Sequence, residues 1–250
     1  MKWVTAVAML VGCACQAQEL WQFGTPNRVY GVYRKVQKTP TYFEEIRIGH
    51  IDVKVQDEVM NGVPCKKYTS TAFFSPKPGG PPVPKIRHYV TWVAPDGRIV
   101  RVFMQYTAFR KNIAADATFR DDEISIQVTE SAKTRSATLF AGSGGPKSFV
   151  NPFLELMAEA DKHRKKVEFQ ALECTTGGIV QYKALVVGKW KGDIANKVFE
   201  GRVIEVDGPE GKLLLYVSQQ GELIQIDLPD GAQVWAQDFD AAPGIKRIGN

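Results

Sequence analysis

The chain has 250 residues, of which 44% are hydrophobic and 24% are charged, and its net charge is +5 at pH 7. This composition is typical of a packed globular protein and excludes an intrinsically disordered one. A positive charge this mild argues against a protein that binds nucleic acid.

The first seventeen residues predict a secretory signal. Lys2 supplies a positive charge, Val4–Val11 form a short apolar stretch, and small residues follow up to Ala17. The apolar stretch is shorter than the roughly 20 residues that a membrane-spanning helix needs. We therefore expect the mature protein to be extracytoplasmic, either periplasmic or secreted.

Two modes of cleavage fit this signal. Cleavage after Ala17 would leave residues 18–250 as a soluble mature chain. The segment Leu10-Val11-Gly12-Cys13 instead resembles a bacterial lipoprotein signal, in which residues 1–12 are removed and Cys13 is acylated. Contact with a membrane is expected only in the second case, through the lipid anchor.

Alternation of apolar and polar residues predicts strands in the first part of the mature chain. Ile46 and Ile48 alternate with polar residues, and a shift of phase near Gly49 predicts a β-bulge. Asn61-Gly62 predicts a tight hairpin turn before a strand over residues 65–74. The next eleven residues, 75–85, contain five prolines and two glycines, which predicts an exposed loop.

The same alternation continues beyond this loop. Strands are predicted over Ile86–Val93 and Ile99–Tyr106, joined by a Pro95-Asp96-Gly97 turn. Further strands are expected around Ile124–Val128, Val180–Val186, Gly201–Val206, Leu213–Ser218, Leu223–Asp227 and Ala232–Gln237. The short turns between most of them favour antiparallel pairing, because parallel strands need long crossover connections.

One segment has the pattern of a helix. Asn151 is a good N-cap, Pro152 suits the first helical position, and apolar residues then recur at helical spacing. We expect an amphipathic helix from Pro152 to about Lys165 that covers one face of the sheet. Residues 142–146 are the expected internal joint of a single β-rich domain over residues 18–250.

Two cysteines remain in the mature chain when the signal is removed after Ala17. Cys65 and Cys174 could form one disulfide in an oxidising compartment. The other interpretation is two buried thiols that behave as small apolar side chains. The tryptophans of the mature chain lie in or beside strand patterns, which favours packing in the core.

No catalytic, metal-binding or cofactor-binding residue is predicted. Ser143 lies in a Gly-rich stretch similar to a nucleophile elbow, but Pro146 delays the helix that such an elbow requires. His50, His88 and His163 are scattered and match no metal-ligand spacing. We therefore expect a non-enzymatic protein without a cofactor.

The assembled pattern resembles one known group of proteins. Many antiparallel strands, Asp-Gly hairpins and the final hairpins of Leu213–Gln237 are similar to those of the periplasmic lipoprotein-carrier superfamily and its uncharacterised exported relatives. The resemblance implies a strongly curved open sheet around an apolar cavity. It identifies no functional residue in this chain.

Together these observations predict a mainly β protein of the α+β class: a curved antiparallel sheet or half-barrel with one helix over a face. The expected function is an exported binding or carrier protein for a lipid or other apolar small molecule. The alternative is a structural or interaction module of the cell envelope, tethered through Cys13 and bound to an envelope protein. A hydrolase acting through Ser143 is the third hypothesis.

Overall fold

The described part of the chain is a single antiparallel sheet. The computed structural model describes residues 28–74, 85–96, 98–108, 111–120, 123–140, 166–173, 178–194, 197–208, 211–220, 222–229, 231–236 and 244–248. Fifteen strands belong to the sheet, and each pairs antiparallel with its neighbours. Within these residues there is no helix, and hence no helix long and apolar enough to cross a membrane.

The strands fall into two runs along the sequence. The first run is β1 (Arg28–Thr39), β2 (Tyr42–Met60), β3 (Val63–Phe74), β4 (Lys85–Val93), β5 (Ile99–Ala108), β6 (Lys111–Arg120), β7 (Glu123–Glu130) and β8 (Lys133–Phe140). The second run is β9 (Lys166–Glu173), β10 (Gly178–Ile194), β11 (Lys197–Gly208), β12 (Gly211–Ser218), β13 (Leu223–Asp227), β14 (Ala232–Ala236) and β15 (Gly244–Ile248).

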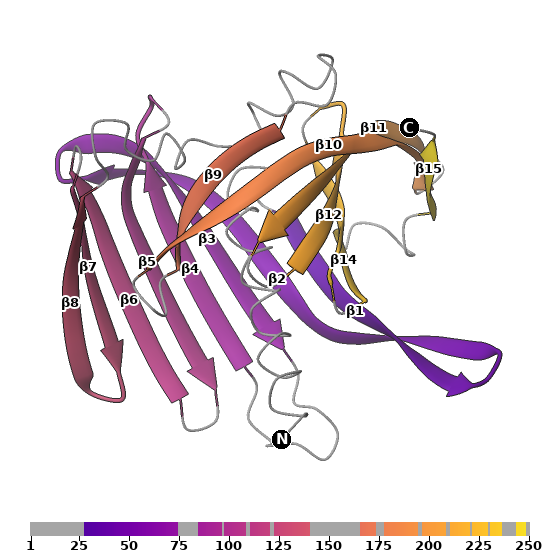
Figure 1. Cartoon of the computed structure of the whole chain (residues 1–250), viewed down its shortest axis with the longest axis horizontal. Coiled ribbons are helices and arrows are strands. Elements are labelled where there is room, and N and C mark those ends of the chain that lie inside the picture. Colours follow the sequence, from indigo (N-terminus) through magenta and orange to yellow (C-terminus); the bar gives the residue numbers. More distant parts are fainter. Residues whose placement is uncertain are drawn as a thin grey trace.

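The first run is a meander, the second is a meander from β9 to β14, and one long-range pairing joins them. β14 pairs with β1, so the order in space is β10-β11-β12-β13-β14-β1-β2 and onward to β8. β9 and β15 both pair with β10 at one end of the sheet, and β8 lies at the other end. The described strands therefore form an open, curved sheet, shown in Figure 1.

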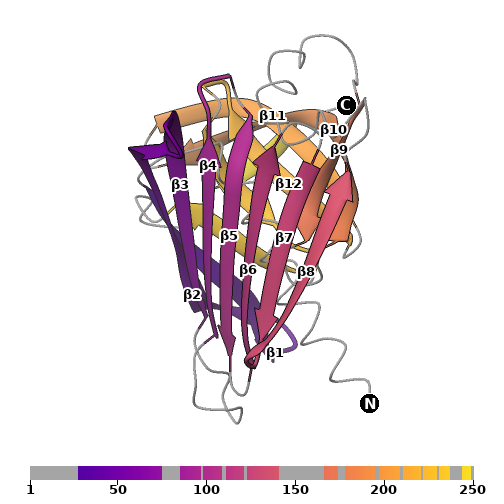
Figure 2. The ribbon, with the colours of Figure 1, turned by 90° about the vertical axis from the view of Figure 1, so that its left-hand side faces the viewer.

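Two regions of the sheet differ in shape. The strands β3–β8 lie side by side as a broad surface that Figure 2 shows from its outside, and we call them the wall. The strands β10–β14 and β1–β2 bend more sharply, and we call them the curled region (Figure 1). The ends of β1 and β2 project from the curled region as a hairpin arm, with Tyr42 and Phe43 exposed at its tip.

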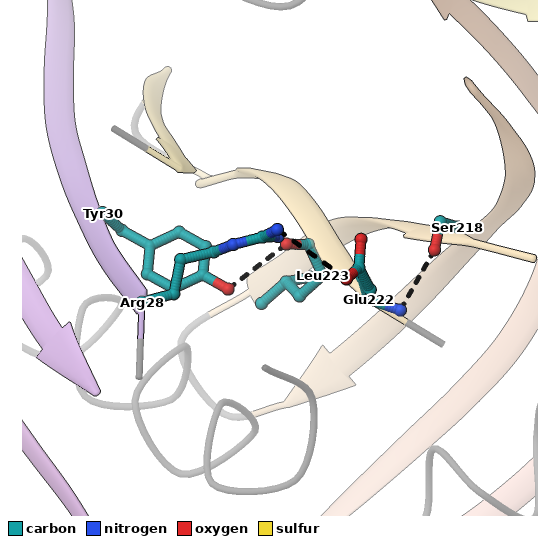
Figure 3. Close-up of polar contacts among 5 residues, drawn as sticks. All are labelled: Arg28, Tyr30, Ser218, Glu222 and Leu223. Carbon is teal, nitrogen blue, oxygen red and sulfur yellow. Dashed lines mark hydrogen bonds and ion pairs between the residues drawn. The ribbon is translucent and has the colours of Figure 1, made fainter. Parts of the chain in front are cut away.

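One face of the curled region points inward. Tyr30 on β1 donates a hydrogen bond from its hydroxyl to the Leu223 carbonyl at 3.3 Å, although β14 lies between their strands. Arg28 on the same face approaches Glu222 at 3.7 Å, as Figure 3 shows. Side chains converge on the concave face of a curved sheet and diverge on the convex face. We therefore assign the face that carries Tyr30 as the inner face.

The inner face is apolar across both regions. Across the seven strands of the curled region and the adjoining β3 it carries one cluster: Tyr30, Val32, Ile51, Val53, Ala72, Tyr182, Ala184, Ile204, Val206, Leu213, Leu215, Val217, Leu223, Ile226, Leu228, Ala232 and Val234. In the wall it carries a second cluster: Tyr89, Val93, Ile99, Val102, Met104, Ile113, Ala115, Ala117, Ile124, Ile126 and Val128. Tyr68, which packs against the second cluster, and Ala72 share one face of β3, so both clusters lie on the same side of the sheet.

The outer face of the curled region is also partly apolar. Trp190 is 1% exposed there and packs with Val203, Tyr216 and Ile224. Its indole N–H crosses over Gly201 to donate to the Val217 carbonyl at 3.0 Å. A Cβ on Gly201 would lie 1.9 Å from that carbonyl oxygen, so only glycine allows this approach.

A ladder of polar side chains crosses the outer face of the wall. Glu58 accepts hydrogen bonds from Trp92 at 3.1 Å and pairs with Lys67 at 2.7 Å. Arg101 lies over the Trp92 ring and forms a two-pronged ion pair with Asp116. These contacts link neighbouring strands from β2 to β6, and they lie beside an outer apolar cluster of Cys65, Val90 and Trp92.

Most of the predicted strands are confirmed. The segment Leu223–Asp227 matches β13, Ile86–Val93 lies within β4, and the 61–62 hairpin turn has the positive φ angles that its sequence favours. The predicted bulge is present as a register shift opposite Val32 and Tyr33. Trp92, Trp190 and Trp235 are buried as expected.

The helical part of the predicted fold is not supported. Residues 152–165 lie outside the described residues, as do the joint at 142–146, the signal at 1–17 and the expected 75–85 loop except for Lys85, which begins β4. Lys166, which follows the expected helix, already begins β9. The described chain is therefore β rather than α+β, and the helix over one face stays a prediction.

Candidate functional site

A strip of polar and aromatic side chains interrupts the apolar inner face of the wall. Alternation within the strands places its members on the inner side of three neighbours, β3, β4 and β5. We define the inner polar strip as Tyr68, Ser70, Arg87, Tyr89, Thr91 and Tyr106.

The strand register brings these side chains together in pairs. Tyr68 lies opposite Thr91, Ser70 lies opposite Tyr89, and Arg87 lies opposite Tyr106. Side chains that face each other across antiparallel strands have Cβ atoms about 4.5–5.5 Å apart. The six residues thus form a continuous surface even though they span 39 positions of the sequence, from 68 to 106.

Arg87 supplies the positive charge of the strip. It is only 6% exposed, and its guanidinium carbon lies 5.2 Å from the centre of the Tyr106 ring. A cation over an aromatic face is stabilised by the ring quadrupole, more strongly where water is excluded. Burial raises the pKa of Tyr106, and the nearby charge of Arg87 partly offsets this rise.

Two buried hydroxyl groups flank this charge along the strands. Ser70 is 1% exposed and Thr91 is fully buried. The Thr91 Oγ1 atom has no hydrogen-bond partner. Leaving a buried hydroxyl unsatisfied costs about 1–3 kcal/mol, so such a group calls for an explanation.

A second polar cluster lies on the outer face of the curled region. The Asp227 carboxylate accepts hydrogen bonds from the Tyr216 hydroxyl and from the side-chain amides of Gln225 and Gln233, at 2.7–2.9 Å. The Asp227 carboxylate therefore finds all three of these hydrogen-bond donors on its own strand and on the two neighbouring strands. We interpret this cluster as structural and the inner polar strip as the candidate binding site.

The residues named from the sequence lie apart from this strip. Cys13, Ser143, His163 and Cys174 fall outside the described residues. Cys65 is 5% exposed on the outer face, where its thiol is free and burial raises its pKa. Its pairing with Cys174 stays a prediction.

The two described histidines lie on the outer face, His50 on β2 and His88 on β4, with β3 between them. His50 stacks on Phe73, and the His88 Nδ1 atom lies 3.0 Å from the Thr71 hydroxyl. Burial lowers the pKa of His88. Among the residues that the structure places, no group of three or more His, Cys, Asp or Glu side chains could hold a metal ion.

Sequence reasoning missed the inner polar strip. A signal was present within β4, where Arg87 and Thr91 share the phase of Tyr89 and Val93, the inward-facing residues of the strand. A charged residue in the buried phase of a strand is uncommon and marks a place where the core carries polar chemistry. The partner residues on β3 and β5 become visible only once the register is known.

The chain was compared with known proteins at three levels. It matches no protein-family model, no curated protein and no solved structure.

Proposed function

We propose that this protein is a non-enzymatic, extracytoplasmic binding or carrier protein that holds a lipid or other apolar ligand against the inner face of its sheet. The observation that carries the proposal is the continuity of that face: apolar side chains extend from β10 through the curled region to β7. Surfaces that bind lipids and drug-sized ligands are concave and mostly apolar, with a few polar groups at defined places.

The wall is the part of this surface best suited to a ligand. Among the described residues, every side chain in the inner cluster of the wall comes from β3–β8. These strands form a single layer of the sheet. The curled region differs, because its inner cluster already combines strands that face each other across the bend. An acyl chain along the wall would contact side chains such as Met104, Ile113 and Ile126.

The predicted secretory signal and the resemblance to periplasmic carriers agree with this function. An exported protein with an apolar binding face can move lipid through an aqueous compartment that lipid alone does not cross readily. The tether at Cys13 would fix the same binding face near a membrane, which is the envelope-module alternative.

Lipid extraction of the purified full-length protein tests the proposal. The protein is exported from a host cell, purified without detergent and extracted with organic solvent, and the extract is examined by mass spectrometry. We expect lipid in about equimolar amount. A folded protein that yields no lipid and binds no fluorescent fatty-acid probe would rule out the proposed function.

Two matched variants locate the ligand. Ile126 and Gln127 are adjacent on β7, where Ile126 is buried on the inner face and Gln127 is exposed on the outer face. Ile126→Asp should abolish probe binding and Gln127→Asp should leave it unchanged. Val128→Thr, which preserves shape, should weaken binding and serves where Ile126→Asp does not fold.

A further inference from the structure

We propose that the tip of the hairpin arm docks this protein on a membrane surface that contains anionic lipids, with Tyr42 and Phe43 at the boundary between head groups and acyl chains. The inference goes beyond the proposed function, because it concerns how the protein meets a membrane rather than what it holds. It is carried by two exposed aromatic side chains at the end of a projecting ribbon and by the net positive charge behind them.

The hairpin arm, residues 34–48, stands apart from the rest of the sheet (Figure 1). β1 pairs with β14 only up to Arg34, and β2 begins to pair with β3 only at Gly49. Between these points the two strands pair with each other and with no other described strand. The five residues from Lys35 to Thr39 extend the ribbon by about 17 Å. The tip can therefore reach a surface that the body of the sheet does not touch.

Large apolar side chains are exposed on both faces of the tip. Tyr42 is 56% exposed and Phe43 is 55% exposed. They are consecutive in β2, so their side chains point to opposite faces of the ribbon. A protein groove would cover one face of the ribbon, whereas the interfacial layer of a membrane surrounds the tip on both faces. Tyrosine is also among the residues enriched at this layer.

The polar groups of the turn are largely satisfied within the arm. The Pro40 nitrogen carries no hydrogen, and the Pro40 carbonyl accepts a hydrogen bond from the Gln37 side-chain amide at 3.4 Å. The Tyr42 backbone N–H donates to the Thr39 hydroxyl at 3.1 Å. These contacts lower the cost of moving the turn out of water. The open edges of the ribbon behind the turn would be costly in hydrocarbon, so the tip enters only the interfacial layer.

The charge of the arm favours anionic lipids. Four basic and two acidic side chains give the arm a net charge of +2: Arg34, Lys35, Lys38, Glu44, Glu45 and Arg47. Lys38 and Glu44 form an ion pair at 2.9 Å beside the tip, and both are 47% exposed, so solvent screens their attraction. Each positive charge near an anionic membrane surface strengthens binding about fivefold.

Vesicle sedimentation measures the docking. The exported protein carries Cys13→Ser in every sample, so that the predicted acyl anchor makes no contribution. Vesicles consist of phosphatidylcholine alone, or of phosphatidylcholine and phosphatidylglycerol in equal amounts. We expect binding to the anionic vesicles to be at least about tenfold tighter, and the difference to shrink at high salt.

Variants of the two aromatic residues test the tip itself. Tyr42→Ser combined with Phe43→Ser should weaken binding to the anionic vesicles roughly tenfold or more, because less apolar area leaves water. Val59→Ser removes a side chain that is 67% exposed at the other end of β2, and it should leave binding unchanged. All three side chains are exposed, so we expect both variants to fold as the wild type does.

Tryptophan fluorescence reports the position of the tip in the membrane. Phe43→Trp should add fluorescence that lipids brominated on their acyl chains quench. Val59→Trp, at the other end of β2, should add fluorescence that these lipids leave unchanged. This measurement detects contact with acyl chains directly, so it separates docking on lipid from a general effect of the variants on solubility.

Opposite charge variants within one ion pair test the role of charge. Lys38→Gln should weaken binding to the anionic vesicles about fivefold, and Glu44→Gln should strengthen it by a similar factor. Lys111 and Glu130 are the matched pair on the wall, 3.7 Å apart and both 51% exposed. Lys111→Gln and Glu130→Gln should leave binding unchanged.

Three results would each overturn the inference: equal binding to the two kinds of vesicle, undiminished binding after loss of both tip aromatics, or no quenching of the Phe43→Trp variant. All of these variants should still bind the fluorescent fatty-acid probe as the wild type does. Absence of probe binding in the wild type would reject the proposed function and leave the docking of the arm standing.

Discussion

In the curled region, apolar residues of one strand pack against residues of strands across the bend, whereas the described inner cluster of the wall comes from one layer. The burial patterns of β12 and β7 show the difference. From Leu215 to Ser218, β12 is buried on both faces, while β7 alternates strictly between Ile124, Ile126 and Val128 and their exposed neighbours. The members of both inner clusters are buried, but among the described residues the cluster of the curled region combines strands across the bend and that of the wall comes from one layer.

The polar residues follow the same division. The outer face of the wall carries ion pairs and cation–π contacts beside a small apolar cluster of Cys65, Val90 and Trp92, and its inner face carries the buried Arg87. The outer face of the curled region buries Trp190 among apolar residues. Stability should therefore depend most on the curled region and ligand binding most on the wall.

The largest effect is expected where Trp190 crosses Gly201. Gly201→Ala places a Cβ against the Val217 carbonyl and displaces the indole from its hydrogen bond, so we expect a loss of about 3 kcal/mol or more in the free energy of unfolding. Urea denaturation measures this loss. Gly188→Ala, on the adjacent strand with open space around its Cβ, is the control and should cost less than about 1 kcal/mol.

Truncation of one isoleucine in each inner cluster compares the two regions directly. Ile204→Ala in the curled region should cost about 4 kcal/mol, because strands on several sides pack against the cavity. Ile126→Ala in the wall should cost about 2 kcal/mol, because a single layer packs around it. Equal losses in urea denaturation would show that the wall is packed as tightly as the curled region.

The ion pair of Arg101 and Asp116 should contribute less. Both side chains are about one-third exposed, at 35% and 33%, so solvent screens their attraction. A double-mutant cycle of Arg101→Gln and Asp116→Asn should give a coupling free energy of about 0.5–1 kcal/mol, and less at high salt. A coupling near zero would mean that the polar ladder positions the strands without stabilising them.

The smallest effect is expected from pH at His88. Burial holds its pKa in the folded protein below the usual 6.5, so the unfolded chain binds the extra proton first as pH falls. The free energy of unfolding should therefore decrease as pH is lowered through about 6.5 toward the folded pKa. In His88→Gln this part of the slope should disappear between pH 7 and pH 5. An unchanged slope would place the pH dependence elsewhere.

The strands missed by the sequence prediction have a physical explanation. β6 contains three alanines, which have little β propensity, and β8 is polar on both faces over its first four residues and lies at an end of the sheet. β1 shows little alternation, since Tyr33 stacks on Trp235 on one face while Tyr30 packs inside on the other. In each case the neighbours in the sheet, rather than the segment itself, determine the strand.

The sequence by itself determined the antiparallel strands with clean alternation, their hairpin turns and the bulge near Gly49, because these depend on neighbours within a few residues. Only the tertiary structure decided that β14 pairs with β1, which joins segments about 200 residues apart. It also decided that Tyr68, Arg87, Thr91 and Tyr106 share one surface. Register and curvature set these contacts, and both arise from the packing of the whole sheet rather than from any local pattern.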